Sequence, residues 1–199
     1  MSHKVDFLQG MEICKNNSER LAASGRIIID DSNGTDPYGL FLLHIAYEEL
    51  AKAVFCFFIH KGWFNYDFVK SIFKKHESKI FILNELLVSF ALQGGVAFLG
   101  GKETGDIKLD EFIQNHSATI SIYREDTKNF LYVRPDGTHW HDPASSIKRI
   151  PERQKSIEEM ISKLHLVLNL IVENSDKELL NNFHIYKEGE NLVLQFDTV

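Results

Sequence analysis

The residues best suited to chemistry lie in the middle of an apolar segment, residues 38–59 (YGLFLLHIAYEELAKAVFCFFI). Glu48, Glu49 and Lys52 interrupt this segment, which is otherwise apolar on nearly every side of the helix that it predicts. Such a helix must be buried almost all round, so at least some of these charges lie in the core. Removing a carboxylate or an ammonium from water costs roughly several kcal/mol unless partners neutralise it. We therefore expect charged partners at the same depth elsewhere in the chain.

Candidate partners interrupt the next two apolar stripes. His76 and Lys79 lie in the stripe of residues 69–90, and Arg124 and Lys128 follow in the next stripe. Residues three or four apart share one face of a helix, so each pair presents its polar groups together. If the three segments are neighbouring helices, the two carboxylates face an imidazole and up to four cations. We predict an ion pair between one carboxylate and Lys52, Lys79 or Arg124.

Two interpretations of this cluster belong to different classes. In the first, ion pairs fix the register of the helices, and Lys52→Met would cost about 3 kcal/mol or more by leaving a buried carboxylate alone. In the second, Arg and Lys bind the phosphates of RNA, His76 transfers a proton and a carboxylate orients them. The accessibility of His76 separates the two, because a structural network would be sealed from solvent.

An enzyme of the second kind would be a metal-independent endoribonuclease, using the ribose 2′-hydroxyl as its nucleophile. It would work in EDTA and leave a 2′,3′-cyclic phosphate, because cations rather than a metal would stabilise the phosphorane. The candidate catalytic residues are His76, Lys79 and Arg124, with Arg134 and His139 of the segment RPDGTH as the alternative. The alternative pair lies in a turn-rich loop, where plain surface residues are the commoner case.

A carboxylate-bridged metal centre is a further alternative, since helical bundles carry such sites on Glu and Glu-x-x-His positions. No Glu-x-x-His pair occurs in the predicted core helices, and Lys52 would repel a cation. His44 and His116 therefore read as core or rim histidines rather than ligands. We expect neither a metal nor another cofactor.

Apolar periodicity predicts the elements that must position these residues. Asp36 can cap a helix that has Pro37 at its first position, and five glycines within residues 94–105 predict a loop. The predicted helices span residues 5–26, 37–61, 65–90, 108–133 and 151–173. Short connections favour an all-α, up-and-down bundle of about five helices.

The C-terminal part of the chain is predicted less regularly than the bundle. Leu179, Leu180 and Phe183 suggest a short helix after Asn174, and residues 191–196 (NLVLQF) could be extended, although a lone strand needs a partner. We expect a single domain over residues 1–199, with its core at about 5–173 and a short helix and tail at 174–199.

Composition narrows the class of protein. With 199 residues, 44% of them hydrophobic, and a net charge of −6, the chain can build one core and is not a general binder of duplex nucleic acid. Cys14 and Cys56 lie in apolar stripes without ligand spacing, which favours buried thiols in a reducing compartment. No signal peptide is evident, and Glu48, Glu49 and Lys52 argue against a membrane span. We expect a cytoplasmic protein.

The phenylalanine content suggests self-association. The chain has 15 Phe residues, and residues 55–64 (FCFFIHKGWF) concentrate aromatic side chains. Because this is more apolar surface than one five-helix core readily absorbs, we expect a symmetric homodimer.

Several segments together resemble a known family. These are Cys14-Lys-Asn-Asn17 with Leu21, YEELAKA at 47–53, HESK at 76–79, and Tyr132-Val133 with Trp140 and Pro143. In this order and spacing they resemble the AbiV family of abortive-infection proteins, placed within the HEPN superfamily of helical-bundle domains. The resemblance covers residues 8–145 or so.

The resemblance implies a HEPN-like bundle, a homodimer and a role in phage defence, in which the infected bacterial cell stops its growth or translation. RNA, a translation component or a phage protein would be the partner. Many HEPN proteins are metal-independent ribonucleases with an Arg, a polar residue and a His at the start of a late helix. Here that helix begins near Arg149 and Arg153, without a His until His165, and RPDGTH has Pro135 at the polar position. Whether the chain is an enzyme is left open.

The resemblance also assigns the family's core polar positions to the charged cluster already described. The candidate binding or core polar residues are Asn17, Glu48, Glu49, Lys52, Lys128 and Tyr132, beside His76 and Lys79. A non-catalytic interaction protein with a purely structural network is the alternative.

Overall fold

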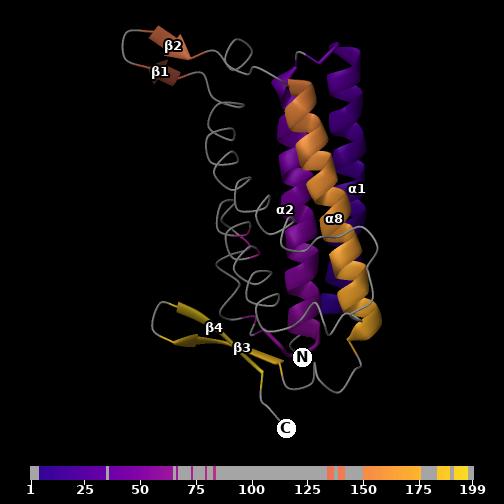
Figure 1. Cartoon of the computed structure of the whole chain (residues 1–199), viewed down its shortest axis with the longest axis vertical. Coiled ribbons are helices and arrows are strands. Elements are labelled where there is room, and N and C mark those ends of the chain that lie inside the picture. The colour runs from indigo at the N-terminus through magenta and orange to yellow at the C-terminus, as the bar shows by residue number, and fades with distance from the viewer. Residues whose placement is uncertain are drawn as a thin grey trace.

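A computed structural model describes residues 5–34, 36–64, 66, 73, 79, 83, 134–136, 139–141, 150–175, 183–188 and 191–196. Three long helices form its body: α1 (Phe7–Asp31), α2 (Pro37–His60) and α8 (Ile150–Asn174) (Figure 1). Two antiparallel hairpins accompany them, β1 (Arg134–Asp136) with β2 (His139–His141) and β3 (Phe183–Glu188) with β4 (Asn191–Phe196).

The first two helices form an antiparallel hairpin with well-defined ends. Asp36 accepts a hydrogen bond from the backbone N–H of Tyr38 at 2.8 Å, and Pro37 occupies the first helical position, which confirms the predicted start of α2. Gly62, with φ of 76°, follows the end of α2 in the left-handed conformation that glycine adopts most readily. α1 continues to Asp31, beyond its predicted end, because Ile29 extends the buried stripe.

Two glycines allow α1 and α2 to approach closely near their connecting turn. A Cβ atom placed on Gly25 would lie 2.7 Å from the carbonyl oxygen of Gly39, and one placed on Gly39 would lie 2.7 Å from that of Gly25. At the same end, a Cβ placed on Gly34 would lie 3.3 Å from Cγ of Pro151, so the turn also contacts the start of α8. α8 therefore runs in the same direction as α2, and α1 runs in the opposite direction (Figure 1).

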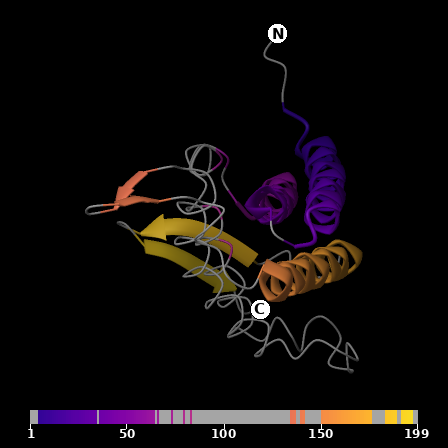
Figure 2. The ribbon, with the colours of Figure 1, turned by 90° about the horizontal axis from the view of Figure 1, so that it is seen from above.

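The core surrounds α2, which packs against both α1 and α8 (Figure 2). Leu40, Leu43, Leu50 and Phe55 are fully buried, which confirms that this helix is enclosed on nearly every side. α8 contributes one apolar face at helical spacing. Its buried hydrophobic residues are Ile150, Ile157, Met160, Ile161, Leu164, Val167, Leu168 and Ile171.

The aromatic segment at the end of α2 is absorbed by this same core. Phe55, Phe57, Phe58, Trp63 and Phe64 are all at most 5% exposed within one chain, and Trp63 makes edge-to-face contacts with two of the phenylalanines. The premise that this segment carries surplus apolar surface was therefore wrong. The homodimer itself stays a prediction.

The prediction of an all-α fold holds for the three long helices of the described residues, but the two hairpins were not part of it. β4 confirms that residues 191–196 are extended, and its partner β3 begins at Phe183, which was wrongly assigned to a short helix. The β1–β2 hairpin lies in the segment that the sequence predicts to be a turn-rich loop. Most residues of the predicted helices at 65–90 and 108–133 lie outside the described residues, so the count of five helices and the single domain stay predictions.

Helix length and hydropathy bear on the membrane question. Among the described residues, no helix is both long enough and apolar enough to cross a bilayer.

Candidate functional site

A buried ion pair lies at the centre of the candidate site. Nζ of Lys79 donates a hydrogen bond to Oε2 of Glu48 at 2.9 Å, and the two side chains are 5% and 2% exposed. Glu48 comes from the middle of α2, and Lys79 lies 31 residues further along the chain. The geometry confirms that Glu48 has a buried cationic partner and selects Lys79 among the candidates.

A second ion pair begins at the next residue of α2. Glu49 and Lys52 form an ion pair within α2, and their side chains are 14% and 21% exposed. Successive residues of a helix are rotated by about 100°, so Glu49 leaves the enclosed face on which Glu48 lies. The charged cluster is thus divided into a sealed pair and a half-buried pair that reaches solvent.

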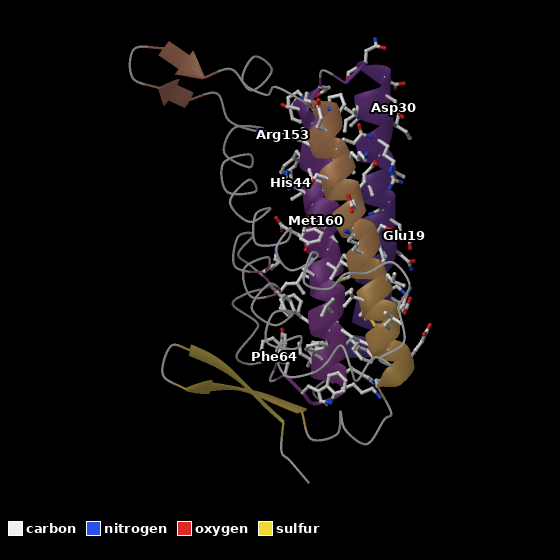
Figure 3. All side chains as sticks on the ribbon, viewed as in Figure 1. Glu19, Asp30, His44, Phe64, Arg153 and Met160 are labelled. Atoms are coloured by element: carbon white, nitrogen blue, oxygen red, sulfur yellow. The ribbon has the colours of Figure 1, made fainter. Side chains whose placement is uncertain are left out.

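His44 lies one helical turn before Glu48 and is 2% exposed, which confirms it as a core histidine. Burial, together with the nearby positive charge of Arg153, lowers the pKa of its imidazole to about 3. Both residues lie toward the end of the molecule where α8 begins (Figure 3). His44 is therefore neutral at physiological pH, and as an uncharged imidazole it has no acidic proton ready to transfer.

α1 brings two polar residues to about the level of Glu48 and Glu49. Oδ1 of Asn17 accepts a hydrogen bond from Nη2 of Arg20 at 2.7 Å, so Asn17 is engaged on its own helix. Ser18 is fully buried, and within the described part of the chain its Oγ makes no hydrogen bond.

Ser18 is absent from the residues that the sequence singled out. A signal for it exists, because Met11, Ser18, Ala22, Gly25 and Ile29 recur at helical spacing and make up the buried stripe of α1. A lone hydroxyl in such a stripe indicates a polar contact or a small space in the core.

The other predicted site residues are placed only in part. His76, Arg124, Lys128 and Tyr132 lie outside the described residues. Arg134 begins β1 and His139 begins β2, on opposite strands of one hairpin, where Arg134 pairs with His141 and Asp136 pairs with His139. The hairpin agrees with the expectation that Arg134 and His139 do not lie on a helix. Their role as an alternative catalytic pair stays a prediction.

The side chains of the sealed pair can be compared with those that a metal centre would need. Across the described ranges, no group of three or more His, Cys, Asp or Glu side chains is arranged to hold a metal ion. The buried carboxylate of Glu48 has a lysine ammonium at 2.9 Å, which already supplies the neighbouring positive charge. This pair of residues fits a salt bridge and does not fit a metal site.

The arrangement can therefore do two things. The Glu48–Lys79 pair ties the middle of α2 to the segment that carries Lys79, in a place where water and a polyanion have almost no access. The Glu49–Lys52 pair forms a polar rim beside it, where a ligand could exchange partners with either charge.

Comparison with family models matches residues 6–151 to the AbiV model of the HEPN type. The matched range contains α1, α2 and the β1–β2 hairpin, and it ends at the start of α8, before the β3–β4 hairpin. Searches among curated proteins and among solved structures returned no match.

Proposed function

The chain belongs to the AbiV family, and from this premise we propose that it acts in abortive infection, arresting a phage-infected bacterial cell by binding RNA or a component of the translation machinery. The family match covers most of the chain and includes all four residues of the two described ion pairs, three of them on α2. Its place of action is the cytoplasm, where both targets are found.

The sealed Glu48–Lys79 pair is the observation that favours binding over cleavage. A residue that touches the scissile phosphate must be reachable by RNA, but these side chains are 2% and 5% exposed. Lys79 is therefore a positioning residue in this proposal, and it holds the fold on which a binding surface is displayed. If the chain were a nuclease, the catalytic residues would be His76 and Arg124, or Arg134 and His139, without Lys79.

The experiment expresses the full chain from an inducible promoter in a bacterial host. Pulse labelling measures protein synthesis, and sequencing of RNA ends from the same cells detects cleavage. We expect protein synthesis to fall without new RNA ends, and His76→Ala to arrest growth as the parent chain does. Lys163→Gln serves as the folded control, because Lys163 forms its ion pair with Glu159 within α8, outside the charged cluster.

Two results would reject parts of this proposal. New RNA ends carrying a 2′,3′-cyclic phosphate, reproduced by purified protein in EDTA and lost in His76→Ala, would establish a metal-independent endoribonuclease instead. Unchanged phage plaque counts, together with normal growth of the expressing cells, would reject abortive infection itself.

A further inference from the structure

Two cysteines that are far apart in the sequence meet across the α1–α2 interface. The side chain of Cys56 in α2 lies close enough to that of Cys14 in α1 for the two thiols to interact, and both residues are free thiols. Gly10 lies one turn before Cys14, and a Cβ atom placed on it would come 3.4 Å from Sγ of Cys56. The side chain of Cys56 thus points at the face of α1 that carries Cys14, at the end of the hairpin away from its turn.

The two thiols differ in access and in neighbours. Cys14 is half-buried and Cys56 is 5% exposed, so a small reagent reaches Cys14 first. Lys52 and Glu49 of the rim pair lie close enough to act on both sulfurs electrostatically. The cysteine pair therefore adjoins the half-buried ion pair and not the sealed one.

We propose that Cys14 and Cys56 form a modification site at which a hydroperoxide closes an intramolecular disulfide between α1 and α2. Cys14 is the attacking thiol and Cys56 the resolving thiol. The assignment rests on the contact between the two sulfurs, on their unequal exposure and on the adjacent ammonium of Lys52. It is independent of whether the chain binds or cleaves RNA.

The electrostatics agree with these roles. The interaction with Cys56 lowers the pKa of the Cys14 thiol, and the positive charge of Lys52 lowers it further. Burial and, to a smaller extent, the negative charge of Glu49 oppose this, but the net shift of the pKa is downward. The same interaction, together with burial, raises the pKa of the Cys56 thiol. The thiolate is the nucleophilic form of cysteine, so Cys14 is the more reactive of the two.

The chemistry balances with hydrogen peroxide as the oxidant. The Cys14 thiolate attacks one peroxide oxygen, the O–O bond breaks, and the departing hydroxide takes a proton to become water, leaving a sulfenic acid. The sulfur of Cys56 then attacks the sulfur of Cys14, the S–O bond breaks, and the leaving hydroxide combines with the thiol proton of Cys56 as a second water. The two sulfurs together lose two electrons, and the peroxide gains them.

The test uses the purified, fully reduced chain and hydrogen peroxide. We expect the intact mass to fall by two hydrogens, non-reducing peptide mapping to join the Cys14 and Cys56 peptides, and sedimentation to stay unchanged. In Cys56→Ser, Cys14 should stop at a sulfenic acid that dimedone traps. In Cys14→Ser, the buried Cys56 should remain unmodified. Circular dichroism verifies that both variants are folded.

A comparison with the unfolded chain separates a built site from ordinary thiol reactivity. The folded chain should lose its Cys14 thiol several-fold faster than the same chain in urea, because unfolding removes Lys52 and Cys56 from its surroundings. Slower loss in the folded chain, or disulfides that only link separate chains, would overturn the proposal.

Discussion

Replacing Lys79 with methionine tests the sealed ion pair directly. Methionine keeps most of the length of the lysine side chain but removes the ammonium that donates to Glu48 at 2.9 Å. The carboxylate would then remain in a position that is 2% exposed, without its cationic partner. Breaking a buried pair in this way costs about 3–5 kcal/mol, because the remaining charge is desolvated and has lost its ammonium partner.

This loss is large against the stability of an ordinary domain, which is about 5–15 kcal/mol. For a chain of this size each kcal/mol lowers the melting temperature by roughly 2–4 °C, so Lys79→Met should unfold about 6–20 °C below the parent chain. Urea unfolding followed by far-ultraviolet circular dichroism, at neutral pH and fixed protein concentration, measures the same difference as a free energy.

Lys52→Met is the matched control, because it removes the same charge from the same cluster. Its partner Glu49 is 14% exposed and can be hydrated once the pair is broken. We therefore expect a loss of only about 0.2–1 kcal/mol, in place of the 3 kcal/mol that a sealed network would give at this position. The double variant Glu48→Leu with Lys79→Met should recover most of the stability lost in Lys79→Met, since it removes both charges of the pair.

The ordering of these variants is the critical result. If Lys79→Met and Lys52→Met melt within a degree or so of each other, the division into a sealed and a half-buried pair is wrong. If the double variant is no more stable than Lys79→Met, the loss arises from packing around Lys79 and not from a stranded carboxylate.

Three further predictions follow from other parts of the structure. Gly39→Ala should lower the free energy of unfolding by about 1–3 kcal/mol, because its Cβ would lie 2.7 Å from the carbonyl oxygen of Gly25 and overpack the interface. In Gly10→Ala, the control, the Cβ would lie 3.4 Å from Sγ of Cys56, so urea unfolding should be nearly unchanged. The fold lowers the pKa of His44 from 6.5 to about 3, so between these pH values the unfolded chain takes up a proton that the folded chain does not. The contribution of His44 to stability is therefore full above pH 6.5, and the free energy of unfolding falls by about 1.4 kcal/mol per pH unit as the pH drops toward 3. His44→Leu should flatten this acid dependence in urea titrations at several pH values, and an equally steep dependence would contradict the assignment. Sedimentation at micromolar concentration should show a homodimer, and a single species near the chain mass of 22.9 kDa would rule it out.

The helical body could be predicted from local signals alone. Asp36 and Pro37 mark the start of α2 because a cap and a proline act within one turn of the chain. The end of α1 was placed too early, since Asp30 and Asp31 resemble turn residues. The burial of Ile29 against the second helix outweighs that preference, and it depends on tertiary packing.

The strand β3 could not be predicted in the same way. Leu179, Leu180 and Phe183 follow a helical spacing, whereas the pairing of Phe183 with Phe196 joins positions far apart in the chain. The alternation of apolar and polar residues within Phe183–Glu188 was the available signal. It is short, and two-stranded hairpins gain their stability from pairing and from neighbouring structure rather than from intrinsic preference.

The candidate site shows where sequence reasoning reaches its limit. Charges in an apolar stripe predicted a buried ion pair correctly, because burial without a partner is too costly. They did not predict which cation is used, since that depends on the rotation of each helix about its axis. The contact between Cys14 and Cys56 was missed for the same reason, although each cysteine was placed correctly in an apolar stripe.

Glu48 and Glu49 make this limit concrete. They are the same residue type at adjacent positions, yet their side chains are 2% and 14% exposed, because one residue of helix turns the second carboxylate out of the core. A stability assay therefore tests the role of Glu48, and a binding assay tests the role of Glu49. Glu49→Gln should leave the melting temperature within about 2–4 °C of the parent chain, because the half-buried pair reaches solvent and its loss costs at most about 1 kcal/mol. If it also relieves the growth arrest, the rim beside α2 belongs to the binding surface. If the arrest is unchanged, that surface lies on another face of the molecule.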